Sequence, residues 1–121
     1  MTSSSDERKG PVSSFFRPLK DATTFRADQP AKADLFAGGQ LFVGLNCFEP
    51  AQAQPPHTHA GADKFYLVVS GKARMTVGAE TRVAEAGTVV WAPADVPHGV
   101  DEALERTVML VAIAPPPGKR Q

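Results

Sequence analysis

The sequence has little of several features that define whole classes of protein. Its 121 residues include one cysteine, so no disulfide can form within the chain. The 13 basic side chains are balanced by 13 acidic ones, which leaves no excess positive charge to attract nucleic acid or an anionic membrane. No apolar run reaches the roughly 20 residues of a membrane-spanning helix, and the N-terminus lacks an apolar signal segment. We therefore expect a soluble, cytoplasmic protein that binds neither nucleic acid nor membranes.

The chain length suits one folded domain. Residues 1–13 contain few apolar side chains, and we expect them to form a disordered lead-in. Residues 115–121 begin with three prolines, which cannot extend a strand because proline lacks a backbone N–H. The domain is therefore predicted to span residues 14–114. Cys47 lies in an apolar segment of this domain. We expect it to be a small buried side chain rather than a nucleophile.

Between these ends, short segments with apolar or alternating patterns are separated by glycine, proline and small polar residues. Strands are predicted over residues 41–48, 64–69, 72–77, 81–84, 88–92 and 107–113. A short helix or turn is predicted over residues 101–106. No window of ten or more residues has helical periodicity. Many short strands at this spacing favour an all-β jelly-roll barrel or sandwich.

One predicted strand is apolar on both of its faces, over residues 65–69. Such a strand is expected where the outer face of a barrel packs on another sheet or on a partner subunit. We therefore predict that the protein forms a homodimer.

The three histidines occur at two places in the chain. His57 and His59 are two residues apart, so on an extended segment both imidazoles point to the same side and can share one metal ion. His98 follows a proline-rich turn at the start of another apolar run. The alternative interpretation of His57 and His59 is a pair of surface histidines near a loop.

The spacing around these histidines resembles the two motifs of the cupin superfamily. The first motif, G-x5-H-x-H-x(3,4)-E-x6-G, is matched at His57, His59 and Gly71. The second motif, G-x5-P-x-G-x2-H-x3-N, is matched at Gly87, Pro93 and His98. Four motif positions differ, with Ala51 for the first glycine, Lys64 for the glutamate, Asp95 for the central glycine and Glu102 for the asparagine. Aspartate is tolerable in place of the central glycine because it adopts left-handed backbone conformations more readily than most residues.

The resemblance covers about residues 51–102 and implies the fold of a small, single-domain bacterial-type cupin, a double-stranded β-helix or jelly-roll barrel. It also implies a divalent metal ion bound by His57, His59 and His98 together with a glutamate, with Fe, Zn, Ni or Mn as candidates. The activity stays open, because this fold hosts enzymes, sugar isomerases, storage proteins and sensor domains.

The glutamate position of the first motif is occupied by Lys64. A protonated lysine has no lone pair and cannot bind a metal ion. Three interpretations follow: the histidines hold the metal alone, the neighbouring Asp63 replaces the glutamate, or the metal is lost and Lys64 binds an anionic ligand or acts as a base. Alternation along a strand argues against Asp63, since adjacent side chains point to opposite faces. A lysine at the start of a strand can also extend to solvent, which would leave Lys64 without a role in the site.

Tyr66 and Val68 are in phase with Lys64 and are expected to line the interior, together with Trp91 and Met109 from other strands. Three kinds of function follow from these side chains. The first is a metal-dependent, dioxygenase-like enzyme acting on a small organic substrate, in which Lys64 or Tyr66 holds an anionic intermediate. The second is a non-enzymatic, metal-free module that binds an anionic metabolite through Lys64. The third is an isomerase or cyclase in which a histidine transfers protons.

Overall fold

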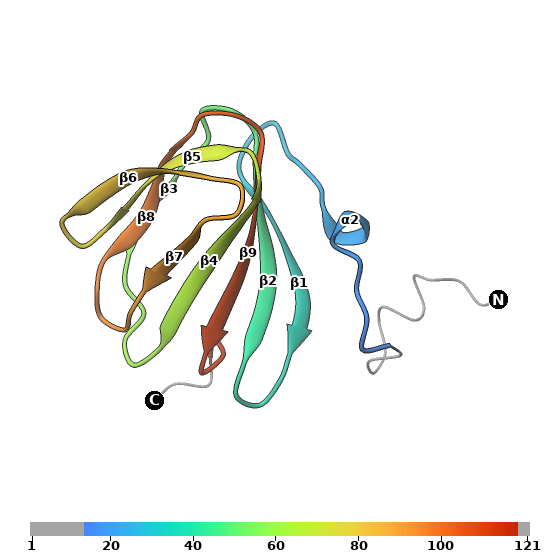
Figure 1. The fold of residues 1–121 in the computed structure, drawn as a ribbon. Coiled ribbons are helices and arrows are strands. Elements are labelled where there is room, and N and C mark those ends of the chain that lie inside the picture. Colours follow the sequence, from blue (N-terminus) through green and yellow to red (C-terminus); the bar gives the residue numbers. More distant parts are fainter. Residues whose placement is uncertain (1–13, 119–121) are drawn as a thin grey trace.

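The structure is a computed structural model that describes residues 14–118 (Figure 1). Within this range it contains one helical turn, α2 (Leu19–Ala22), and nine strands. The strands are β1 (Ala31–Ala37), β2 (Phe42–Phe48), β3 (Gln54–His57), β4 (Asp63–Ser70), β5 (Lys72–Val77), β6 (Glu80–Glu85), β7 (Val89–Ala92), β8 (His98–Ala103) and β9 (Thr107–Ala114). The prediction for residues 1–13 lies outside the described residues. No helix within residues 14–118 has the length and apolar character needed to cross a membrane.

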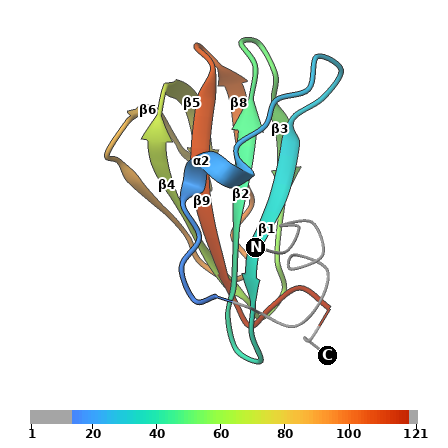
Figure 2. The same cartoon turned by 90° about the vertical axis from the view of Figure 1, so that its right-hand side faces the viewer.

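The strands form two antiparallel sheets that face each other (Figures 1 and 2). One sheet has five strands in the order β1-β2-β9-β4-β7, and the other has four in the order β3-β8-β5-β6. Strands that are far apart in the sequence are neighbours in both sheets, as in the pairing of β4 with β9. This double-stranded β-helix confirms the predicted all-β jelly-roll fold.

The six predicted strands all occur, with ends that agree to within one residue. The prediction of a helix or turn over residues 101–106 is wrong at its start, because residues 101–103 complete β8 and only residues 104–106 bend. The two acidic side chains of residues 101–103 interact with the neighbouring strand β5. Asp101 Oδ2 accepts a hydrogen bond from the Thr76 hydroxyl at 2.6 Å. Glu102 forms an ion pair with Arg74 at 3.1 Å.

The core of the domain lies between the two sheets. It contains Phe48, Tyr66, Val68, Met75, Val100, Met109 and Val111. The interior positions predicted for Tyr66, Val68 and Met109 are confirmed, since all three side chains are fully buried. The prediction for Trp91 is wrong: its side chain is 56% exposed, because Val90 and Ala92 are the residues of β7 that face the core.

The outer face of the five-stranded sheet is only partly covered. At one end, Leu45 and Cys47 of β2 pack against Leu19 and Phe25 of the N-terminal segment, whose α2 turn lies across this face in Figure 2. Burial raises the pKa of the Cys47 thiol, which agrees with the predicted buried, unreactive side chain.

The rest of this outer face, over β4 and β7, carries exposed apolar side chains. They are Phe65, Val69, Val89 and Trp91. The strand predicted to be apolar on both faces is therefore present, with one face in the core and the other open. The homodimer stays a prediction.

A tight turn between β4 and β5 requires the glycine of the first motif. Gly71 has a φ of +88°, and a Cβ at this position would collide with the carbonyl oxygen of Arg106 and with Thr107. The backbone N–H of Lys72 donates a hydrogen bond to Thr107 Oγ1 at 3.1 Å. This close approach fixes the end of β4 against the start of β9 and so sets the position of the strand that carries Lys64.

Candidate metal centre

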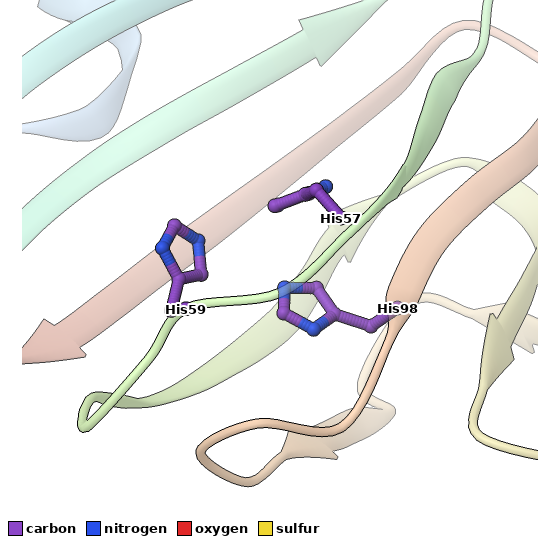
Figure 3. A group of neighbouring side chains, drawn as sticks. All are labelled: His57, His59 and His98. Atoms are coloured by element: carbon purple, nitrogen blue, oxygen red, sulfur yellow. The ribbon is translucent and has the colours of Figure 1, made fainter.

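Two neighbouring strands and one loop bring the three histidines together (Figure 3). His57 ends β3 and lies directly opposite His98, the first residue of β8. His59 lies in the loop that leads to β4. Each histidine offers one ring nitrogen, and these three atoms lie within 4.8 Å of one another. The three side chains can therefore hold a single metal ion.

The structure positions His59 in a different way from the one predicted. We expected both residues on one extended strand, but β3 ends at His57. His59 is positioned instead by its backbone carbonyl, which accepts a hydrogen bond from the N–H of Asp95 at 3.2 Å. This bond ties the loop of His59 to the turn that precedes His98, so the two loops hold their imidazoles in a fixed relation.

The turn before His98 depends on two aspartates. Asp95 has a φ of +68°, the left-handed conformation that the motif normally assigns to glycine. Asp63 Oδ1 accepts a hydrogen bond from the backbone N–H of Ala94 at 2.9 Å. Because Asp63 is exposed and lies outside the histidine cluster, the interpretation of Asp63 as a metal ligand is wrong. Its role in the structure is to support the turn that positions His98.

Gly99 allows the strands of His57 and His98 to approach closely. A Cβ at this position would lie 2.7 Å from the carbonyl oxygen of Gln54 and 3.0 Å from the backbone nitrogen of Pro56. Real Cβ atoms do not approach backbone so closely, so a side chain here would push β3 away from β8. Glycine after His98 is therefore needed to keep His57 opposite it.

Backbone carbonyl groups orient two of the three imidazole rings. His57 Nδ1 lies 3.0 Å from the carbonyl oxygen of Pro55, and His98 Nδ1 lies 3.0 Å from that of Val96. A carbonyl oxygen can only accept, so Nδ1 is the protonated nitrogen and donates in both cases. In the neutral rings, the lone pair is then on Nε2, the atom available to a metal ion.

His98 Nε2 provides a test of whether a metal ion fits the site. This atom is buried and has no hydrogen-bond partner among residues 14–118. A buried acceptor without a partner costs about 1–3 kcal/mol. Coordination of a metal ion by the lone pair would remove that cost, and imidazole nitrogen is a good ligand for Zn, Fe, Cu and Ni. The residues present therefore fit a divalent transition metal.

The electrostatics of the site favour the neutral form of His57 and His98. Burial, which penalises the charged ring, is the main cause that lowers the pKa of His57 and of His98, and the positive charge of Lys64 lowers both further. Neutral imidazole is the form that binds metal, because the proton and the metal compete for the same lone pair.

Lys64 points into the barrel. Its residue is 4% exposed, and its Nζ lies 4.5 Å from the centre of the Tyr66 ring. Burial, together with the positive charge of Lys32, lowers the pKa of Lys64 to about 8. The interpretation that Lys64 extends to solvent is therefore wrong. None of the ion pairs within residues 14–118 involves Lys64, so this ammonium group has no carboxylate partner there.

Tyr66 of β4 lies beside the histidine site and is hydrogen-bonded to β3 in the opposite sheet. Its ring centre lies 6.1 Å from that of His98, and its hydroxyl donates a hydrogen bond to Gln54 Oε1 at 3.0 Å. Burial raises the pKa of Tyr66, so the phenol stays protonated and acts as a donor. Lys64 and Tyr66, the two residues predicted to act beside the metal, thus lie in contact with each other and next to the histidine cluster.

A cleft of about 630 Å³ opens beside the site, between β1–β2 and β3. Its charged and amide-bearing lining consists of Arg26, Gln29, Lys32, Asn46 and Gln54, and we call it the cationic cleft. Sequence analysis missed Lys32 and Gln54, because the strands that carry them, β1 and β3, were not predicted. The only sequence signal for Lys32 is its alternation with Ala31 and Ala33, which many surface loops also show.

Comparison with known proteins identifies the family of the chain. Residues 44–114, more than half of the chain, match the Cupin domain family. An uncharacterized protein of Streptomyces coelicolor, SCO3923, is 39% identical over 76 residues, which cover 63% of this chain and 71% of that protein. The crystal structure of TT1209 from Thermus thermophilus is 33% identical, with a TM-score of 0.79 over 84% of this chain and 98% of that one. An RmlC-like cupin from Desulfovibrio desulfuricans is 26% identical, with a TM-score of 0.75 over 84% and 96% of the two chains. With its fold and both histidine motifs in agreement, the chain belongs to the cupin family.

Proposed function

We propose that this cupin binds a divalent metal ion through His57, His59 and His98 and uses it to act on a small anionic organic substrate. The observation that carries the proposal is the buried Nε2 of His98, which has no hydrogen-bond partner among the described residues and belongs to a group of three ligand atoms within 4.8 Å of one another. Three protein ligands leave coordination positions open, which is the arrangement of a catalytic rather than a structural metal site.

Lys64 supports the anionic character of the substrate. A glutamate at this position would cancel one of the two positive charges of the metal. Lys64 instead adds a positive charge to the same interior, where it is 4% exposed. A negatively charged ligand restores the balance, and in a buried site that balance matters more than it does in water.

Oxygenation is the reaction that we favour. Iron bound by three histidines would supply open positions for both oxygen and the substrate. The chain contributes the three ligands, the ammonium group of Lys64 to hold the substrate anion, and the neutral phenol of Tyr66, whose hydroxyl would turn from Gln54 to donate to the substrate. The apolar side chains of Val68, Met75 and Met109 keep water away from the interior.

A second candidate function is a metal-free module that binds an anionic metabolite. The observation that favours it is Lys64 itself, a buried cation with no ion-pair partner among residues 14–118. In this case the ammonium group replaces the charge of the metal, and the three histidines form a neutral wall of the pocket.

Elemental analysis of untagged protein, purified without a chelator, separates the two candidates. We expect about one metal ion per chain, lost in His57→Ala and retained in Asp63→Asn. The second variant is the matched control, because it removes the charge of the neighbouring carboxylate and keeps the oxygen that accepts the hydrogen bond from Ala94. Bound iron supports oxygenation, and bound zinc contradicts it. No bound metal after incubation with excess iron, zinc, nickel and manganese would contradict the metal centre and leave the second candidate.

A further inference from the structure

The cationic cleft has an unusual charge balance for a chain whose net charge is zero. Two of its lining residues are basic, Arg26 and Lys32, and none of the described residues that line it is acidic. Arg26 is neutralised by a two-point contact with Asp28 at 2.9 and 3.1 Å. None of the ion pairs within residues 14–118 involves Lys32. The cleft therefore presents one lysine whose charge is not paired.

Lys32 stands on the inner face of its sheet. It lies opposite Asn46 of β2, which in turn lies opposite Met109 of β9. Met109 is a core side chain, and residues directly opposite one another on neighbouring strands share a face. Because β1 is an edge strand, the ammonium group of Lys32 stays exposed at the opening while its stem follows the inner face.

The cleft leads to the histidine site through a short series of contacts. Gln54 lines the cleft and accepts the hydrogen bond from the Tyr66 hydroxyl. The Tyr66 ring in turn contacts Lys64 and His98. Gln54 and Tyr66 thus connect Lys32, on the cleft, with the buried Lys64, and the positive charge of Lys32 contributes to the lowered pKa of Lys64 in agreement with this placement.

We propose that the ligand of this site is a small organic dianion of the dicarboxylate class, which enters through the cationic cleft with one carboxylate at Lys64 and the other at Lys32. This inference rests on the proposed function for the inner anion and adds the outer one. Lys32 lines the cleft, and Lys64 is buried behind Gln54 and Tyr66 at its inner side, so two lysines without ion-pair partners among the described residues match a ligand with a charge at each end. A monoanion would leave Lys32 unpaired.

Matched pairs of simple carboxylates test the inference. Calorimetry would compare succinate with butyrate, and glutarate with pentanoate, on protein loaded with its own metal. We expect each dianion to bind about tenfold more tightly than the monoanion of equal length, the factor that corresponds to 1.4 kcal/mol. Lys32→Gln should remove this preference, so that succinate binds no more tightly than butyrate. Arg82→Gln is the control: it removes one exposed positive charge from the other side of the barrel and should retain the preference.

Three results would overturn the inference. They are equal affinities for both members of each pair, an equal loss of the preference in Arg82→Gln, and no binding of any of the four carboxylates at millimolar concentration. Metal content, measured on the same samples, keeps the two proposals distinguishable. Protein without metal that still prefers succinate through Lys32 would support the dianion and contradict the metal centre. Protein with metal that shows no preference would do the reverse.

Discussion

The barrel has two open sides, and their chemistry is opposite. On one side, the cationic cleft separates β1–β2 from β3 and has a volume of about 630 Å³. On the other, a cleft of about 600 Å³ separates β5–β6 from β7 and is lined mainly by Met75, Val77, Val83, Val89 and Trp91. We call this second opening the apolar cleft. The volumes are similar because both openings arise where the edge strands of the two sheets diverge, so the side chains decide what each opening can accept.

The apolar cleft continues onto an exposed apolar surface. Val83, Val89 and Trp91 are 47%, 62% and 56% exposed, and Phe65 lies directly opposite Trp91 on β4. We propose that a second copy of the chain covers this side, which is the homodimer that the sequence predicts. In these proposals the small ligand binds on one side of the barrel and a protein partner on the other.

The largest expected effect is on the side of the cationic cleft. His98→Ala removes the most buried of the three ligands, and we expect metal affinity to fall by at least roughly 100-fold, more than for loss of a group that only supports a ligand. Elemental analysis and competition with a chromophoric chelator measure this change. His98→Gln, which keeps a polar side chain, controls for unfolding and should show the same loss. Full metal occupancy in both variants would show that the three histidines are not the ligands.

A substitution at Trp91 is the most direct test of the proposed dimer on the side of the apolar cleft. Trp91→Asp would bury a charge at the centre of the proposed dimer, so we expect the mass from light scattering to fall from dimer to monomer at micromolar concentration. Leu41→Asp is the matched control, since Leu41 is also exposed, at 47%, but does not line the apolar cleft. A wild-type protein that is already monomeric at this concentration would contradict the proposal.

A smaller effect is expected from exchanging the charge at the inner end of the cationic cleft. Lys64→Glu restores the carboxylate of the family motif and removes a repulsive charge. We expect metal affinity to rise about tenfold, while succinate binding is lost. Lys64→Gln should give intermediate values of both, because it only removes the charge. Succinate binding that survives in Lys64→Glu would show that Lys64 does not hold the inner carboxylate.

The smallest effect concerns the contact between the cationic cleft and the core. Tyr66→Phe removes the hydroxyl that donates to Gln54, and we expect the free energy of unfolding to fall by about 1 kcal/mol. Water can reach the half-buried Gln54 from the cleft, which limits the cost. Urea denaturation measures it, and metal content should stay at the wild-type value. A loss above about 3 kcal/mol would mean that the ring, and not only the hydrogen bond, has lost its packing.

The sequence predicted those strands whose own side chains define them. β4 and β9 are apolar runs, and β5 alternates along its whole length. The three missed strands have residues that are poor strand formers by themselves. β1 contains three alanines and an aspartate, β3 contains two prolines, and β8 contains Asp101 and Glu102, so all three depend on their neighbours for the extended conformation.

The candidate site was predictable to the extent that motif spacing sets it. Spacing singled out His57, His59 and His98, and strand phase placed Tyr66 inside, whereas the direction of Lys64 stayed open until the structure showed it buried. Spacing could not reveal that His59 is held by the turn of Asp95, or that Asp63 supports Ala94 instead of a metal. Lys32 could not be found for a related reason: its place at the site comes from the pairing of β1 with β2.

The pairing of His57 with His98 has a consequence for the motion of the barrel. β3 is a four-residue edge strand that contains two prolines, pairs only with β8, and is irregular between Gln54 and His57. Few backbone hydrogen bonds hold it, so we expect it to open locally more readily than the longer central strands. A metal ion bound by both His57 and His98 would hold the end of β3 against β8. Gln54 and Pro55 of β3 also line the cationic cleft. We therefore expect that loss of the metal ion would also widen the opening of this cleft. Hydrogen exchange at the backbone amides of β3 would report both changes.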